Sequence, residues 1–207
     1  MVRKLINQTV NFKMKKMKNH ILITLLILIG FTSNAQNTLP VEELINYSGN
    51  SNKGLTSENI SYVKDVNGKL DKFEGTWRGD HMGKSYTITI FERTINYRTN
   101  PNIKKDELSL RYSITNSDGS LYATNMDFPD DSPWIVGGQY LYNDNTYYFD
   151  FYGDDQKCSL DGTLAALVSS DRISITLFGR GEMIAGEDCP KIREVFPDRK
   201  SIVLSKQ

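Results

Sequence analysis

Alternation of apolar and polar residues dominates the chain from Leu70 onward, and it limits the possible folds more than any other feature. Four runs show it most clearly: Ser85–Phe91, Leu108–Ile114, Thr146–Tyr152 and Arg172–Phe178. In the first run, Tyr86, Ile88 and Ile90 share one face, while threonines occupy the other. Successive side chains of a β-strand point to opposite faces, so each run is predicted to be a half-buried strand.

Short turn sequences separate these runs, and further strand candidates lie between the turns. Turns are predicted at Asp118-Gly119, Asn143–Asn145, Asp161-Gly162 and Ser169–Asp171. The additional strands are Phe73–Arg78, Ser120–Thr124, Gln139–Tyr142, Thr163–Val168 and Ser201–Ser205. Loops of this length join antiparallel neighbours, and no stretch after Leu70 has a helical period. The fold class is therefore predicted to be all-β: an antiparallel meander of about eight to ten strands, in a closed barrel or a sandwich.

The N-terminal residues have the three parts of a secretion signal. The basic stretch Lys13–Lys18 precedes the apolar run Ile21–Ile29, which is too short to cross a bilayer. Small residues follow, so residues 1–35 are predicted to be a signal peptide cleaved between Ala35 and Gln36. A short membrane anchor is the alternative. Export places the protein in the periplasm or outside the cell. Three start codons fit this arrangement: Met1, Met14 and Met17.

The net charge of zero is divided unevenly along the chain. The predicted signal holds six of the 25 basic residues and no acidic ones, which leaves 19 basic and 25 acidic residues, a charge of −6, for residues 36–207. This sign disfavours binding to nucleic acid or to an anionic membrane surface.

Residues 36–69 are polar and lack a hydrophobic period, as the stretch Asn46–Gly54 illustrates. Such a segment buries too little apolar surface to offset the entropy of ordering it. We therefore expect a loosely structured leader that lies largely outside a barrel domain of residues 70–207. A short helical turn at Val41–Ile45 fits the pattern, as does a strand at Ile60–Val63 that pairs with the domain edge.

Two cysteines, Cys158 and Cys189, lie 31 residues apart after the signal. An exported protein meets an oxidising compartment, so this pair is predicted to form a disulfide. A metal or redox pair is the alternative, but the sequence has no Cys-x-x-Cys motif and no histidine beside either cysteine.

Motifs for catalysis are missing from the sequence. His81 is the only histidine after the signal, and its polar, glycine-bracketed surroundings predict a solvated hairpin loop. Gly-x-Ser-x-Gly, His-Glu-x-x-His and phosphate-binding loops are absent. Two acidic groups are candidates for calcium or glycoside hydrolysis: Asp127 with Asp130 and Asp131, and Asp150 with Asp154 and Asp155. Neither has EF-hand spacing, so no catalytic residue, metal site or cofactor is predicted.

The most specific local pattern is Leu70-Asp-Lys-Phe-Glu-Gly-Thr-Trp-Arg78. It resembles the opening of lipocalins and fatty-acid-binding proteins, and it is similar to a family of uncharacterised secreted domains of Gram-negative bacteria. The resemblance implies a small lipocalin-like barrel in which Gly75 gives a tight entry to the first strand and Trp77 closes the barrel floor. In lipocalins this Trp packs against an Arg near the chain end, for which Arg193 and Arg199 are the possible partners here.

Aromatic residues on the predicted inward faces are the candidates for ligand contact: Tyr86, Tyr112, Tyr147, Phe149 and Phe151. A barrel of about eight strands has room for side chains or for one small ligand. The expected function is an exported, non-enzymatic module that binds a small apolar ligand or an envelope partner. A structural or interaction barrel with a filled core is the alternative, and a hydrolase is the least favoured. The polar outward residues Ser109, Arg111 and Ser113 suit water, not lipid, so no integral membrane segment is expected after the signal.

Overall fold

The computed structural model describes residues 37–47, 55–56, 59–97, 100–130, 132, 134–153, 158, 160–180 and 194–207. All of them belong to one structural unit, Asn37–Gln207. The predicted signal peptide, its cleavage site at Ala35 and Gln36, and Cys189 lie outside the described residues.

Strands make up most of the described chain, and two short 3₁₀ helices accompany them. In chain order the elements are β1 (Thr38–Pro40), η1 (Val41–Tyr47), β2 (Tyr62–Lys64), η2 (Asp71–Phe73), β3 (Gly75–His81), β4 (Lys84–Tyr97), β5 (Asn100–Asn116), β6 (Leu121–Thr124), β7 (Val136–Asn143), β8 (Thr146–Phe151), β9 (Gly162–Ser169), β10 (Arg172–Gly179) and β11 (Ser201–Lys206). The four alternating runs of the sequence lie in β4, β5, β8 and β10, and their apolar faces are buried.

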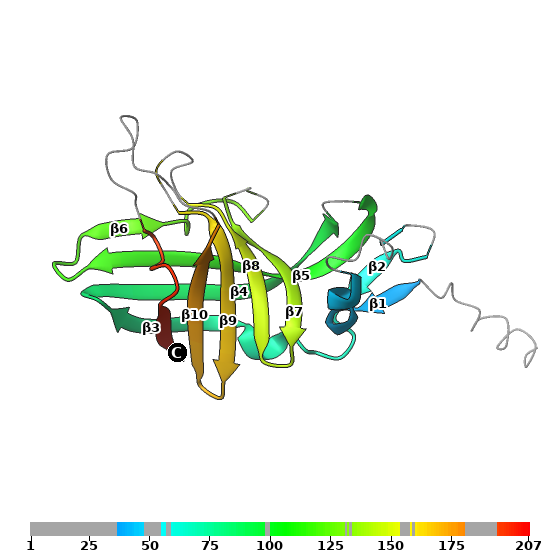
Figure 1. The fold of residues 1–207 in the computed structure, drawn as a ribbon, viewed down its shortest axis with the longest axis horizontal. Helices are drawn as coiled ribbons and strands as arrows, with labels where there is room; N and C mark the ends of the chain where they lie inside the picture. Colours follow the sequence, from blue (N-terminus) through cyan, green and yellow to red (C-terminus); the bar gives the residue numbers. More distant parts are fainter. Residues whose placement is uncertain are drawn as a thin grey trace, which may run out of the picture. The chain divides into compact units, whose positions relative to one another are not determined.

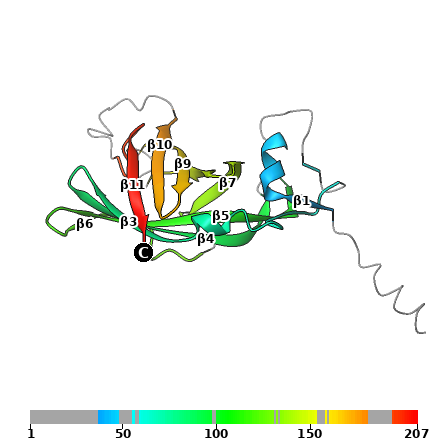
Figure 2. The ribbon, with the colours of Figure 1, turned by 90° about the horizontal axis from the view of Figure 1, so that it is seen from below.

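Eight of the described strands close a barrel, which Figures 1 and 2 show from two sides. Around it they follow the order β3, β4, β5, β7, β8, β9, β10 and β11, and β11 pairs back with β3. Every neighbouring pair is antiparallel. The predicted all-β antiparallel meander is therefore confirmed, as a barrel and not a sandwich. Three further strands, β1, β2 and β6, lie off the barrel path.

The first barrel hairpin is tighter than the sequence predicts. Met82 and Gly83 alone connect β3 to β4, and both have positive φ angles, 49° and 75°. Two such residues form the hairpin turn whose twist matches that of the strands. His81 therefore belongs to β3, where it pairs with Lys84 and is half-buried, instead of lying in a solvated loop.

The segment 36–69 differs, in its described residues, from the expected loosely structured leader. β4 and β5 run past the barrel toward β1 and β2 (Figure 1). β2 pairs in parallel with β5 at Tyr62↔Lys104 and Val63↔Lys105, and β1 pairs in parallel with β2. Five apolar side chains of this segment are buried: Leu39, Val41, Leu44, Ile60 and Val63.

The edge of β5 explains why this segment is ordered, because the β5 backbone supplies hydrogen-bond partners that the polar segment cannot supply for itself. The helical turn expected at Val41–Ile45 lies within η1, and the strand expected at Ile60–Val63 overlaps β2.

Trp77 is fully buried, and its indole N–H donates a hydrogen bond to the carbonyl of Phe73 at 2.9 Å. Gly75 has a φ of 120°, and a Cβ there would lie 3.0 Å from Cε of Lys206. Lys206 also places its ammonium 5.2 Å from the centre of the Trp77 ring. The cation near the chain end is thus Lys206 and not Arg199, which pairs with Asp198, while Arg193 lies outside the described residues.

Replacing Trp77 should separate the packing role of this residue from the general effect of losing an indole. We expect Trp77→Ala to lower the free energy of unfolding by about 3–5 kcal/mol, because it leaves a large cavity and an unpaired carbonyl. Trp134→Ala is the matched control, since that indole is 40% exposed. It should cost about 1 kcal/mol or less. Urea unfolding curves measure both values, and equal losses would contradict the buried packing role of Trp77.

Candidate ligand-binding site

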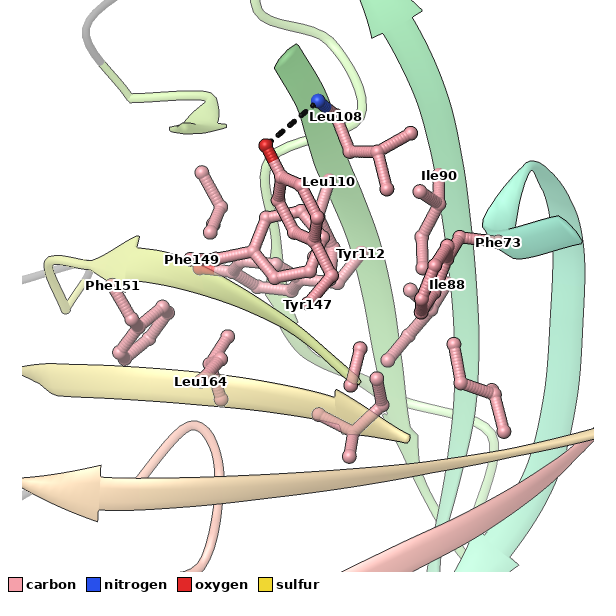
Figure 3. Close-up of a cluster of buried hydrophobic side chains, with 14 of the residues drawn as sticks. Phe73, Ile88, Ile90, Leu108, Leu110, Tyr112, Tyr147, Phe149, Phe151 and Leu164 are labelled. Atoms are coloured by element: carbon pink, nitrogen blue, oxygen red, sulfur yellow. Dashed lines mark hydrogen bonds between the residues drawn. The ribbon is translucent and has the colours of Figure 1, made fainter. Parts of the chain in front are cut away.

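The five predicted ligand contacts all lie in the barrel interior, so the inward faces were predicted correctly. Figure 3 shows four of them, and the fifth, Tyr86, is also buried. Two pairs of these rings are in contact. The ring centroids of Tyr147 and Phe149 are 4.9 Å apart, and those of Tyr112 and Phe151 are 6.3 Å apart. Contact between a ligand and these residues stays a prediction.

Two phenylalanines from outside the strands occupy the interior near the two ends of β8. Phe73 of η2 lies 6.0 Å from the ring of Tyr147. Phe196, which precedes β11, lies 5.1 Å from Phe151 and 5.4 Å from Tyr112. Both phenylalanines are fully buried. Protein side chains therefore surround the aromatic rings that the sequence offered as ligand contacts, and this favours a filled core.

Tyr147 has a second, structural task. Its hydroxyl oxygen accepts a hydrogen bond from the backbone N–H of Leu108 at 3.2 Å (Figure 3). Gly138 makes this approach possible, because a Cβ there would lie 2.2 Å from that hydroxyl and 2.5 Å from the carbonyl oxygen of Leu108. Burial raises the pKa of Tyr147, so the phenol stays neutral.

The barrel is weakly joined between β5 and β7, a line that we call the seam. These strands pair only at Ser109↔Gly137 and Leu110↔Val136. On one side of those pairs, the ammonium of Lys105 donates to the carbonyls of Gly138 and Gln139, both at 2.8 Å.

On the other side of those pairs, Asn125 takes the place of a neighbouring strand. Its amide oxygen accepts from the N–H of Tyr112 at 2.6 Å, and its amide nitrogen donates to the carbonyl of Leu110 at 3.3 Å. The same nitrogen donates to the carbonyl of Trp134 at 3.3 Å. Asn125 is only 2% exposed, so these bonds satisfy strand-edge groups that water does not reach.

A cleft of about 320 Å³ opens on this side of the seam, beside the loop that joins β6 to β7. We call it the seam cleft. Its described lining is Tyr112, Thr124, Asn125, Phe128, Trp134 and Tyr152. Three of these rings are partly exposed: Phe128 and Trp134 by 40% each and Tyr152 by 49%. The rings of Phe128 and Trp134 stack at 6.4 Å with an interplanar angle of 29°.

The polar side chains of the seam cleft are already bonded to the backbone. The hydroxyl of Thr124 donates to the carbonyl of Tyr112 at 3.0 Å and accepts from the N–H of Met126 at 3.2 Å. The amide of Asn125 makes the three bonds described above. The backbone therefore occupies the hydrogen-bonding groups of Thr124 and Asn125, and the rings of Phe128, Trp134 and Tyr152 supply the apolar faces of the lining.

The chain matches the model of a family of unknown function, DUF6705, over residues 17–185. The chain belongs to this family. No curated protein and no solved structure shows a significant match to it. The expected membership of a domain-of-unknown-function family is thus confirmed. The Leu70–Arg78 motif as a mark of that family and a Gram-negative origin remain predictions.

Among the described residues that line the seam cleft of this DUF6705 protein, the sequence predicted only Tyr112 as a ligand contact. Residues 125–135 lack a period, and their acidic residues suggested calcium or a glycosidase instead. Asp130 forms an ion pair with Arg111 at 2.6 Å, and Asp150 pairs with Arg180. Asp131, Asp154 and Asp155 lie outside the described residues. The useful signal was the presence of two aromatic residues, Phe128 and Trp134, in a loop that also contains prolines and aspartates.

A second group of acidic side chains lies where η2 meets β4. Carboxylate oxygens of Asp65, Asp71 and Glu92 come within 4.8 Å of one another. Asp106 is close by, where it accepts a hydrogen bond from the hydroxyl of Tyr62 at 2.7 Å. Burial, followed by the negative charges of Asp106 and Asp65, raises the pKa of Glu92 from 4.5 to about 7.

None of the helices among the described residues is long and apolar enough to cross a membrane.

The shift at Glu92 predicts a dependence of stability on pH. The folded state holds this proton more tightly than the unfolded state, so its contribution is complete below pH 4.5 and is lost as the pH rises through about 7. We expect the urea midpoint to fall between pH 5 and pH 8, and we expect Glu92→Gln to reduce that fall. The exposed residue Glu43 supplies the control, Glu43→Gln. An equal fall of the urea midpoint in the wild type, in Glu92→Gln and in Glu43→Gln would show that Glu92 does not cause it.

Proposed function

We propose that this member of the DUF6705 family is an exported, non-enzymatic binding module that holds a small, uncharged ligand with a flat apolar ring in the seam cleft. One observation carries the proposal: three partly exposed rings, Phe128, Trp134 and Tyr152, border one cleft. Ligand sites are commonly concave and lined by aromatic residues, with volumes from about 300 Å³ upward. Aromatic rings prefer to meet other rings in stacked or edge-to-face contact.

The bonds of Thr124 and Asn125 support an apolar ligand over a polar one. A ligand rich in hydroxyl or amide groups would need hydrogen-bond partners in the cleft. The side chains of Thr124 and Asn125 already form hydrogen bonds with the backbone. A buried polar group without a partner costs about 1–3 kcal/mol, so such a ligand would bind weakly.

The non-enzymatic part of the proposal rests on the same lining. None of its described residues is a histidine, a cysteine or a carboxylate. Thr124 carries the aliphatic hydroxyl of the described lining, and none of the described lining residues is a histidine or a carboxylate that could activate it as a general base.

A barrel without a ligand is the second candidate. The ring contacts of Phe73 and Phe196 favour it, because they occupy the interior that a lipocalin would leave for its ligand. In that case the exposed rings of Phe128 and Trp134 would contact an envelope partner.

Titration with N-phenylnaphthylamine, an uncharged apolar dye that fluoresces in dry sites, tests the ligand proposal. We expect saturable binding that weakens about tenfold or more in Trp134→Ala and in Phe128→Ala. Leu167→Ala is the control, because Leu167 is 49% exposed on β9, outside the cleft. No saturable binding, or equal weakening in all three variants, would refute the ligand proposal.

Export and the disulfide belong to the same proposal. Cleavage after Ala35 delivers the chain to an oxidising compartment, where Cys158 and Cys189 pair. We expect the secreted protein to take up no alkylating reagent before reduction and two equivalents after it, as measured by intact mass. Two alkylated cysteines in the unreduced protein would exclude this pairing.

A further inference from the structure

The aromatic pair of the seam cleft sits on a loop that follows β6, and short turns shape this loop. The N–H of Phe128 donates to the carbonyl of Asn125 at 3.4 Å, and the N–H of Ile135 donates to that of Ser132 at 3.2 Å. These bonds join the loop to itself. The positions of the Phe128 and Trp134 rings relative to the barrel must therefore depend on contacts between the loop and the barrel.

Arg111 of β5 makes three of those contacts. Its guanidinium donates to the carbonyl oxygens of Asn125 and Met126 through one nitrogen and pairs with the Asp130 carboxylate at 2.6 Å through another. The group lies 5.8 Å from the centre of the Phe91 ring, and the side chain is 15% exposed. One side chain thus holds the loop on both sides of Phe128.

Arg93 of β4 adds a second bond to the same loop. It donates to the backbone carbonyl of Asp130 and pairs with Glu107 at 3.0 Å. Glu107 is 1% exposed and also pairs with Lys105 at 3.3 Å. A buried ion pair therefore fixes the direction of Arg93 before it reaches the loop.

The charges in this chain of contacts do not cancel. Lys105, Arg93 and Arg111 supply three positive charges against two negative ones, on Glu107 and Asp130, which leaves +1 (3 − 2). Backbone carbonyl oxygens face the cations, and they belong to Gly138, Gln139, Asn125, Met126 and Asp130. On the loop itself, the carbonyl oxygens of Asn125, Met126 and Asp130 all accept from guanidinium groups, those of Arg111 and Arg93.

We infer that Arg111 is the positioning residue of the seam cleft: its guanidinium sets the placement of Phe128 and Trp134 and so the affinity for a flat ring. The inference rests on the proposed function for the ligand, but the placement of the rings can be measured without one. A lysine has the same charge, but all its donors are on one nitrogen. The bonds of Arg111 leave from two nitrogens toward groups on the two sides of Phe128, so Arg111→Lys should not restore the cleft.

Fluorine NMR of protein labelled with fluorotryptophan measures this placement directly. The chain has two tryptophans, so Trp134 reports on the cleft and the buried Trp77 is an internal control. Trp134→Phe assigns the two resonances. We expect Arg111→Met and Arg111→Lys each to move the Trp134 resonance and leave that of Trp77 in place. The dissociation constant for N-phenylnaphthylamine should rise about tenfold or more in both.

Two further variants keep the test decisive. Arg172→Met removes an exposed arginine from β10 and should change neither resonance. Asp130→Asn leaves the fold intact, because its carboxylate is 75% exposed, and it should move the Trp134 resonance in the same direction by less. An unmoved Trp134 resonance in Arg111→Met, or full recovery in Arg111→Lys, would overturn the inference. A moved resonance in a protein whose wild type binds no dye would confirm the positioning role and refute the proposed ligand.

Discussion

The barrel closes where β5 meets β7, and the two strands share only two residue pairs there. Each strand edge beyond those pairs carries backbone groups that would be costly to bury without partners. Three side chains supply the partners: Tyr147 to β5, Lys105 to β7, and Asn125 to β5 on the far side. Gly138 has to be a glycine, since a Cβ would occupy the space that the Tyr147 hydroxyl needs.

The seam also explains why charged residues are buried in β5. This strand continues past the barrel and is covered by β2 on one edge, so Lys105, Asp106 and Glu107 are all under about one-tenth exposed. Buried charges persist only when they are paired and hydrogen-bonded. Glu107 pairs with both Lys105 and Arg93, and Arg93 in turn holds the loop of the seam cleft. The closure of the barrel and the shape of the cleft thus depend on one set of bonds.

The candidate site lies beside the barrel core for the same reason. Phe73 and Phe196 fill the interior with rings, while the loop between β6 and β7 borders a hollow outside it, the seam cleft. Asn125 keeps water from the backbone of β5 at the base of this hollow, and Phe128 and Trp134 stand at its side. Tyr112 belongs to both regions, because it lines the cleft and also contacts Phe196.

The sequence alone determined the strands and their buried faces, because period two is a local property: Tyr86, Tyr112 and Phe149 were placed inward by their spacing. It also identified Trp77 as a packing residue. Only the tertiary structure decided what those faces meet. Glu92 lies 27 residues from Asp65, and Phe196 lies 45 from Phe151, so no spacing rule connects them. The order in residues 37–47, the seam and the cleft all depend on the edge that β5 presents. The edge of β5 can pair with other segments only after strands that are distant in the sequence have paired. The local pattern of the sequence does not specify that pairing.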